Sequence, residues 1–456
     1  MSMNQESQKK IFYRKIFRLV LPIVLQNLLS AAVNSADVVM LNYVSQEAIS
    51  AVSLATQYSS ILFMVYYGLG TGATMLCAQY YGKGDMKAIQ MVEGIALRFS
   101  VGISLIFAVA AFCIPELMMM VFTKDTALIE IGASYLRIVS LSYFCWGFIE
   151  IYLAVLRSTG RVTISMALNI SALVMNVFLN AVFIFGLFGA PELGAAGVAL
   201  ATSISRLTEL ILCFVVSARS KEIKLKPSLM FRKGGILLKD FIRLSLPALG
   251  NDVAWALAFS MYSVIMGHMG SDVVAANSIV VVVRNFGTVF CFGLANAGGI
   301  LIGNEIGEKK LELAKADTSR VVRLTIVSGF VGGLLVFLAT PFVLQYASLS
   351  ETAMYYLKYM LYINVYYIMG AAVNTTLIAG VFRAGGDSRF GFVCDLVDMW
   401  CYAVPLGFLA AFVFKLPVLW VYFLLCTDEF VKWPWVIRHY KSYKWLKNIT
   451  RDISET

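Results

Sequence analysis

One carboxyl group early in the chain stands among polar residues at helical spacing. Gln26, Ser30, Asn34 and Asp37 are separated by four, four and three residues, which places them on one face of a helix. Amide, hydroxyl and carboxylate oxygens suit Na+, and burial brings the proton exchange of a carboxyl group closer to neutral pH. We therefore predict that Asp37 binds a coupling ion, either a proton or Na+. The alternative is that Asp37 only caps polar contacts between helices.

Two later segments carry polar faces that match this stripe. The first face holds three asparagines, Asn169, Asn176 and Asn180. The second face holds a hydroxyl group and two opposite charges, those of Thr202, Arg206 and Glu209. If these faces meet the stripe on the first helix, amide and hydroxyl oxygens surround the carboxyl group of Asp37.

Further ionisable residues lie within apolar segments, where a charge at a helix centre costs about 2.5 to 3.5 kcal/mol and by default indicates a function. The candidates for lining a substrate cavity are Gln26, Asn34, Asp252, Asp395 and Asp398. For Asp252 the alternative is a structural ion pair with Arg243 or another basic group. For Asp395 and Asp398 the alternative is pairing between helices.

Other charges in these segments are more typical of buried pairing partners than of ligands. This group comprises Glu150, Arg284 and the pair of Arg206 and Glu209. Near the end of the chain, the spacing of Asp428, Glu429 and Lys432 predicts an internal salt-bridge cluster.

Long apolar runs must position all of these side chains. The 456 residues are 59% hydrophobic and 14% charged, against about 25% charged in soluble domains, so a soluble fold could not bury the apolar surface. A helix needs roughly 20 apolar residues to cross a bilayer. The sequence predicts an all-α membrane protein with about twelve transmembrane helices, at residues 17–43, 54–80, 94–115, 128–156, 162–188, 194–217, 241–268, 275–303, 321–345, 353–382, 389–413 and 416–437.

Basic residues lie in alternate connections rather than in one folded module. They occupy the amino terminus, the connections after even-numbered spans, among them Lys224, Lys310 and Arg383, and the tail. The positive-inside rule explains this pattern, so the net charge of +10 does not indicate nucleic acid. Both termini are predicted to be cytoplasmic in the plasma membrane. No cleavage site follows the first apolar run, and we expect the first span to be retained.

Sequence anchors recur at an offset of 225 to 226 residues. The pairs are RLVLP (18–22) with RLSLP (243–247), GLGTGATMLCAQYYGKGD from Gly68 with GLANAGGILIGNEIGEKK from Gly293, and AVLRSTGR (154–161) with GVFRAGGD (380–387). Each unit holds six spans, and because six is even both units enter the membrane from the same side. This parallel repeat is a common plan of transporters, with substrate between the halves.

The repeat also predicts the domain organisation. We expect a six-helix bundle at residues 1–216, a basic cytoplasmic linker at 217–240, a second six-helix bundle at 241–438 and a cytoplasmic tail at 439–456. Pro22 and Pro247 occupy equivalent positions in the two halves, where a proline bends a helix and acts either as a hinge or as a static kink.

Several kinds of chemistry have no support in the sequence. The chain has only two histidines, His268 and His439, and no nucleophile lies near a base, so an enzyme is not expected. No Walker loop predicts ATP hydrolysis. The eight cysteines are scattered without CxxC spacing, which indicates packing residues and neither disulfides nor a zinc site.

With these segments in view, the chain resembles the multidrug and toxic compound extrusion (MATE) family over nearly its whole length. The matching segments are LPIVLQNLLSAAVNSADVVMLNYVSQEAISAVSLATQ, GLGTGATMLCAQYYGKGD, VLRSTGR, GAAGVALATSISR and VFRAGGDSRF. The resemblance implies two bundles around a central cavity and the efflux of drugs or metabolites, coupled to H+ or Na+ and without a cofactor. The partners are small-molecule substrates, cationic or amphipathic, and the lipid bilayer, and a monomer is expected.

The resemblance also implies roles for particular residues. In the DinF-like branch of the family, an aspartate in the first span works with two residues of the fifth and a threonine of the sixth, which correspond to Asp37, Asn176, Asn180 and Thr202. Asn180 departs from the aspartate that the family often has there. A single carboxylate neutralises Na+ less well than two, which favours proton coupling.

Two alternatives to an exporter stay open at this point. One is a flippase of lipid-linked substrates on a related fold, although such proteins commonly have extra spans and a strongly basic cavity. The other is a membrane sensor that does not transport. Acidic residues that another branch of the family uses align with Trp255 and Ala372, so a cation site of that kind is not expected in the second half.

Overall fold

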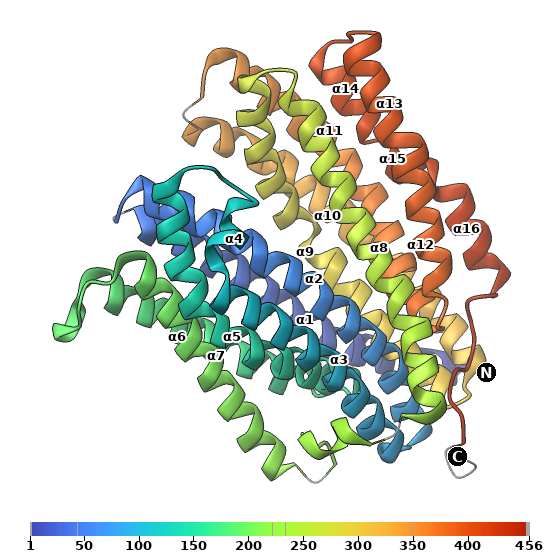
Figure 1. Cartoon of the computed structure of the whole chain (residues 1–456). Coiled ribbons are helices and arrows are strands. Elements are labelled where there is room, and N and C mark those ends of the chain that lie inside the picture. The colour runs from blue at the N-terminus through green and yellow to red at the C-terminus, as the bar shows by residue number, and fades with distance from the viewer. Residues whose placement is uncertain (1, 43, 221, 233, 348, 453–456) are drawn as a thin grey trace. The chain divides into compact units, whose positions relative to one another are not determined.

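The computed structural model describes residues 2–42, 44–220, 222–232, 234–347 and 349–452, with side chains from Glu6 onward except those of residues 34–39 and 41–42. The chain divides into two compact units, which we call the N-terminal unit (residues 25–246, with Asp452) and the C-terminal unit (residues 1–24 and 247–451). Within the described residues the secondary structure is helical throughout, which confirms the predicted all-α class (Figure 1).

The N-terminal unit contains the carboxyl-terminal part of α1 and the amino-terminal part of α8, with the helices between them. The bounds are α1 Ser2–Asn42, α2 Gln46–Lys83, α3 Met86–Cys113, α4 Pro115–Met120, α5 Thr126–Ser158, α6 Val162–Phe185, η1 Leu187–Gly189, α7 Gly194–Arg219, η2 Pro227–Phe231 and α8 Gly235–Gly267. Its core is apolar and packs buried side chains such as Leu62, Leu136 and Val198 around the buried ring of Tyr66.

The C-terminal unit contains the remaining parts of α1 and α8 and all later helices. These are α9 Ser271–Gly307, α10 Leu311–Tyr346, α11 Glu351–Asn374, η3 Thr375–Phe382, α12 Ser388–Val397, η4 Asp398–Ala403, α13 Val404–Phe408, η5 Leu409–Val413, α14 Val418–Leu425, α15 Asp428–Val431 and α16 Trp433–Ser442. The segments η3, η4 and η5 are π-helical turns, which occur often at functional sites.

The helices follow the predicted spans closely. Ten of them are long and apolar enough to cross a membrane, counted over the described residues. The remaining two spans correspond to α8, which carries Asn251 and Asp252, and to the run from α14 to α16, which is interrupted near Asp428. The loops between the helices are short. The helices extend past the apolar runs, because the polar residues at their ends continue the same backbone hydrogen bonding.

The turns between helices reproduce the sequence repeat in detail. After α2, Gly84 N–H donates to Tyr81 O over 3.0 Å and Asp85 N–H to Tyr80 O over 3.0 Å. After α9, Lys309 N–H donates to Ile306 O over 3.0 Å and Lys310 N–H to Glu305 O over 3.0 Å. Both turns are Schellman motifs with a left-handed residue, glycine in the first half and lysine in the second.

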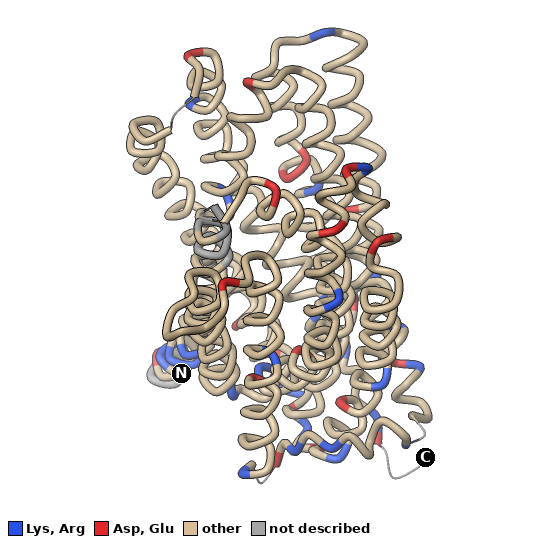
Figure 2. The backbone as a smooth tube through the Cα atoms, turned by 60° about the vertical axis from the view of Figure 1, so that its left-hand side comes forward, with Lys and Arg blue, Asp and Glu red and all other residues tan. Residues whose placement is uncertain are grey.

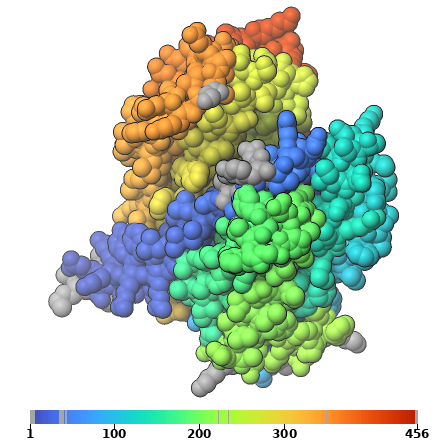
Figure 3. All heavy atoms as spheres, turned by 90° about the vertical axis from the view of Figure 1, so that its left-hand side faces the viewer, coloured from blue at the N-terminus to red at the C-terminus, as the bar shows by residue number. Residues whose placement is uncertain are grey.

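The two compact units do not coincide with the two sequence repeats. In α1 the chain passes from one unit to the other after Val24, two residues beyond Pro22. In α8 it passes back after Leu246, directly before Pro247. The start of α1 therefore belongs to the C-terminal unit, where the guanidinium of Arg320 lies 5.6 Å from the ring of Phe12. Figure 3 shows this dark-blue start of α1 beside the orange segments of the same unit.

The predicted linker and tail are packed rather than extended. Arg98 of α3 donates from Nε to the carbonyl oxygen of Met230 over 2.6 Å, so the linker is bound to the N-terminal unit. In the tail, Trp445 is fully buried. Burial opposes ionisation of Asp387, but its hydrogen bond with His439 over 3.1 Å and the nearby charge of Lys447 hold the pKa of this carboxyl group below its usual range.

Charged residues are distributed unevenly along the helices. In Figure 2, long stretches of the helices are tan and carry neither a blue basic nor a red acidic residue. Uncharged stretches of this kind are what a helix that crosses the apolar part of a bilayer needs.

Candidate functional site

The predicted polar site of the N-terminal unit forms between α6 and α7. Asn176 donates from Nδ2 to Thr202 Oγ1 over 3.3 Å, and Asn180 donates from Nδ2 to Asn176 Oδ1 over 3.3 Å. Asn180 is fully buried. The structure thus brings together three of the four residues proposed for ion coupling. The fourth, Asp37, has its side chain outside the described residues, as has Asn34, and its role stays a prediction.

A second cluster in the same unit pairs the charges that the sequence predicted as partners. Arg206 donates from Nη1 to Glu209 Oε2 over 2.7 Å, and Asn169 donates from Nδ2 to Glu209 Oε1 over 3.4 Å. The Arg206 guanidinium also lies 4.8 Å from the ring centre of Trp146, whose indole N–H donates to Glu150 Oε1 over 3.0 Å. Arg206 is therefore held by a carboxylate and an aromatic face.

In the C-terminal unit, a polar network begins at the end of the tenth span. Arg383 donates from Nη2 to Asp252 Oδ1 over 2.7 Å and to Asn251 Oδ1 over 2.8 Å. Asn251 in turn donates from Nδ2 to Asp395 Oδ2 over 2.8 Å. Asp252 therefore forms a structural ion pair, with Arg383 rather than with Arg243. Arg383 directly follows η3, after the tenth predicted span, but its side chain is only 5% exposed and belongs to the network.

Lys432 is the centre of the second part of this network. Its Nζ lies 3.2 Å from Asp395 Oδ1, 3.3 Å from Glu429 Oε2 and 3.7 Å from Asp398 Oδ2. Asn374 donates to Glu429 Oε2 over 2.7 Å. The predicted salt bridge between Glu429 and Lys432 is thus present, and it includes both aspartates of α12 and η4, as the interhelical alternative proposed.

Tyrosines complete the network on the side of α8 and α11. Tyr262 donates to Asp428 Oδ2 over 3.1 Å, and Tyr367 donates to Glu429 Oε1 over 3.5 Å. Both oxygens of the buried Asp398 carboxyl group lack a hydrogen-bond donor among the described residues.

The network contains more carboxyl groups than basic groups. Its carboxyl groups are those of Asp252, Asp395, Asp398, Asp428 and Glu429, and its basic groups are those of Arg383 and Lys432. If every group ionised, three negative charges would be in excess inside a membrane protein, where an unpaired buried charge costs several kcal/mol. Protons or small cations bound here would offset part of this charge. No group of His, Cys, Asp and Glu side chains in the described part of the chain has the spacing of a metal site.

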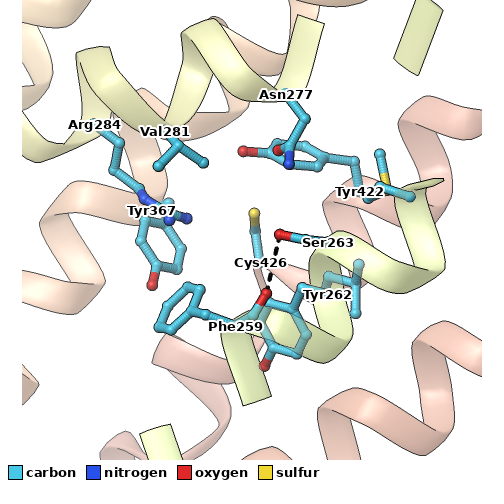
Figure 4. A pocket seen from close by; sticks show the side chains of 11 residues that line it. Phe259, Tyr262, Ser263, Asn277, Val281, Arg284, Tyr367, Tyr422 and Cys426 are labelled. Carbon is cyan, nitrogen blue, oxygen red and sulfur yellow. Dashed lines mark hydrogen bonds between the residues drawn. The ribbon is translucent and has the colours of Figure 1, made fainter. Parts of the chain in front are cut away.

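A pocket opens beside this network, between α8, α9, α11 and α14. Its cavity volume is about 20 Å³, which is room for a water molecule, and its walls include Phe259, Asn277, Arg284, Tyr367 and Tyr422 (Figure 4). The guanidinium of Arg284 lies 4.8 Å from the ring centre of Phe259 and 5.5 Å from that of Tyr367. The expected pairing partner of Arg284 is not found, because among the described residues no carboxylate oxygen lies within 4.0 Å of it.

The candidates for a substrate cavity lie apart from this pocket. Asp395 and Asp398 are 6% and 4% exposed and are held in the network, and Asp252 is paired. Gln26 is half-buried on α1. Sequence reasoning missed Arg383, Asn374 and the two tyrosines as network members. The unbalanced charge of Asp252 within a span was the available signal that a basic side chain had to be near.

Solved structures share the fold of this chain. The chain has a TM-score of 0.84 with the outward-facing conformation of a multidrug resistance MATE family transporter of the MOP superfamily, at 18% identity, covering 94% of this chain and 96% of the other. A MOP superfamily transporter from Pyrococcus furiosus gives a TM-score of 0.83 at 17% identity, with coverage of 94% and 96%. The fold is that of a MATE-type membrane transporter.

Sequence comparison identifies the family. The sequence model of the MatE family matches residues 22–182 and 247–409, and the chain therefore belongs to this family. It is 27% identical to the uncharacterized transporter YisQ of Bacillus subtilis, over 95% of each chain. It is 23% identical to the probable multidrug resistance protein NorM of Thermotoga maritima, over 96% of this chain and 95% of the other. The protein is a transporter and not an enzyme.

Proposed function

We propose that this protein is a secondary active exporter of organic compounds, cationic or amphipathic, that exchanges them for protons or Na+. The observation that supports ion exchange best is the excess of buried carboxyl groups over basic groups in the C-terminal unit. Such an excess binds and releases protons or small cations when access to either side of the membrane changes. Relatives named as multidrug resistance proteins support the substrate class.

We further propose that Asp37, Asn176, Asn180 and Thr202 form the coupling site of the N-terminal unit, as the likeness to the DinF-like branch implies. The hydrogen bonds that join Asn176, Asn180 and Thr202 support this assignment. Because asparagine replaces a second carboxylate at position 180, protons are the better-suited coupling ion. The protein would act as a monomer in the plasma membrane, with both termini in the cytoplasm.

The test uses purified protein in liposomes, with export of a cationic dye measured under separate proton and Na+ gradients. Asp37→Asn keeps the size of the side chain but fixes its charge at zero, so gradient-driven export should fall to the background rate. Asn180→Asp restores a second carboxylate, and export should become more dependent on Na+ because two negative charges neutralise a cation better than one. Full proton-driven export by Asp37→Asn would exclude this residue from the mechanism, and absence of any export by the wild type would favour a sensor.

A further inference from the structure

The start of α1 has two faces, and the fold of the C-terminal unit uses only one of them. Phe12, Ile16 and Leu19 are buried, and the guanidinium of Arg320 in the same unit lies 5.6 Å from the ring centre of Phe12. These contacts fix the rotation of the helix about its axis. The opposite face therefore points away from the unit, and its side chains are exposed in every turn between residues 10 and 21.

Two rows of three residues run side by side along this exposed face, one basic and one apolar. The basic row is Lys10, Arg14 and Arg18, and the apolar row is Tyr13, Phe17 and Leu21. Each row repeats every four residues, which is about 6 Å along the helix axis. The rings of Tyr13 and Phe17 stack with their centres 6.5 Å apart, and Leu21 is 59% exposed. Cationic and apolar side chains thus lie next to each other at each level of the helix.

The basic row has no anionic partner in the part of the chain that the structure describes. Lys10, Arg14 and Arg18 form neither a hydrogen bond nor an ion pair there. Between residues 6 and 33 the sequence has one carboxyl group, that of Glu6, at the far end of the row. Like charges four residues apart repel each other and destabilise a helix. An anion from outside the protein would relieve this repulsion.

The apolar row continues into the first span, and this continuity gives the depth of the basic row. Arg18 lies three residues before Leu21, about 5 Å along the axis, and Arg14 lies seven residues before it, about 10 Å. The headgroup layer on each side of a bilayer is about 5 to 8 Å thick. With Leu21 at the edge of the hydrocarbon, the long side chains of both arginines reach the level of the lipid phosphates. The rings of the apolar row lie at the same level, where aromatic side chains are enriched in membrane proteins.

We propose that the basic and apolar rows of α1 together bind a phospholipid with a net negative headgroup. The guanidinium groups of Arg14 and Arg18 hold the phosphate through charge-assisted hydrogen bonds, and Lys10 adds a further charge at the outer end. An acyl chain lies along Phe17 and Leu21. A zwitterionic headgroup carries a cation of its own, which the basic row repels, so the site prefers an anionic lipid. The inference does not depend on the exporter function, because lipid binding is measured without transport.

The binding experiment uses the purified whole chain in detergent, titrated with phosphatidylglycerol or with phosphatidylcholine of the same acyl chains. Native mass spectrometry counts the lipids retained on the protein and gives a dissociation constant for the first of them. Each basic side chain near an anionic headgroup strengthens binding about fivefold. The first phosphatidylglycerol should therefore bind about tenfold to thirtyfold more tightly than the first phosphatidylcholine. Equal affinity for the two lipids would overturn the proposal.

Charge-neutral variants locate the site. Arg14→Gln combined with Arg18→Gln should lower the affinity for phosphatidylglycerol to that for phosphatidylcholine, which itself should not change. Lys441→Gln combined with Lys444→Gln is the matched control, because it removes two exposed charges elsewhere in the same unit and should leave the preference intact. A preference that survives the arginine variant, or that is lost equally in the control, would exclude α1. If the arginine double variant does not insert, the two single variants give the same test, and each should weaken phosphatidylglycerol binding about fivefold.

Free phosphate separates a lipid site from a simple anion site. An excess of inorganic phosphate should displace no more phosphatidylglycerol than ammonium chloride of the same ionic strength does, because phosphate makes no contact with the apolar row. Specific displacement by phosphate would show that the basic row binds anions without a lipid, and the proposal would then be wrong.

Discussion

In the buried network of Asp252, Asp395, Asp398, Asp428, Glu429, Arg383 and Lys432, loss of a basic side chain and loss of an acidic one should change stability in opposite directions. Lys432 lies within 3.7 Å of three carboxyl groups, and it is 3% exposed. Lys432→Met leaves these carboxyl groups without their shared cation, and we expect a loss of about 3 to 5 kcal/mol in the free energy of unfolding, which is typical of a broken buried ion pair. The measurement is the midpoint of denaturant-induced unfolding in detergent micelles.

Asp398→Asn is the matched control for Lys432→Met. It removes one negative charge from a network that has an excess of them, and the two closer partners of Lys432, Asp395 and Glu429, remain. The unfolding midpoint of Asp398→Asn should therefore equal or exceed that of the wild type. A loss as large as that of Lys432→Met would show that the network is balanced with every carboxylate ionised.

At the scale of helices, the two repeats close equivalent turns with different residues. Lys309 adopts φ 60° where its repeat counterpart Gly84 adopts φ 81°. A side chain in the left-handed region costs about 1 to 2 kcal/mol. Lys309→Gly should stabilise the protein by about 1 kcal/mol, and Gly84→Ala should destabilise it by a similar amount. Thermal unfolding of both variants measures the difference, and a stabilising Gly84→Ala would contradict it.

Close packing of α9 on α10 depends on two facing glycines. A methyl group at Gly332 would overlap the carbonyl oxygen of Gly287, which is rigid backbone, so the helices would have to separate. This overpacking costs about 1 to 3 kcal/mol, which exceeds the gain of about 0.5 to 1 kcal/mol that alanine brings to a helix. Gly332→Ala should therefore unfold at a lower temperature than the wild type.

Gly102 of α3 provides the comparison for Gly332. An added methyl group at Gly102 meets nothing within 4 Å. Gly102→Ala should therefore raise stability by about 0.5 to 1 kcal/mol through helix propensity alone. If both alanine variants shift the unfolding temperature in the same direction, the contact between Gly332 and Gly287 does not limit the packing.

For the whole molecule, the basic connections predict the orientation in the membrane. Cysteines introduced next to Lys224 and Lys310 should react only with reagents on the cytoplasmic side, and cysteines next to Glu192 and Asp272 only with reagents outside. The exposed Cys113 and Cys401 are first replaced by alanine to remove background labelling. Reaction of one set from both sides would contradict the arrangement of twelve spans.

The hinge role of Pro22 and Pro247 also belongs to this scale and stays a prediction. The chain changes from one compact unit to the other at these prolines, which is where bending of α1 and α8 would connect movements of the two units. Neither repeat is a compact unit by itself, because the start of α1 and the start of α8 each pack into the unit formed mainly by the other repeat.

The sequence by itself determined the helical class, the positions of the spans and the repeat. Hydropathy over about 20 residues and turns such as those at Gly84 and Gly386 depend on neighbouring residues, so they can be recognised along the chain. The polar faces that join Asn176 to Thr202 were also predictable, because α6 and α7 are consecutive and their faces follow from helical spacing.

Only the tertiary structure decided which charges meet. Arg383 pairs with Asp252 across 131 residues of sequence, and Lys432 reaches Asp395 from a different helix, so neither contact has a local signal. The same holds for Arg284, whose place in an apolar segment suggested a charged partner, whereas its guanidinium lies against the rings of Phe259 and Tyr367. Pairing between distant segments depends on how helices pack, and a single sequence carries no direct record of that packing.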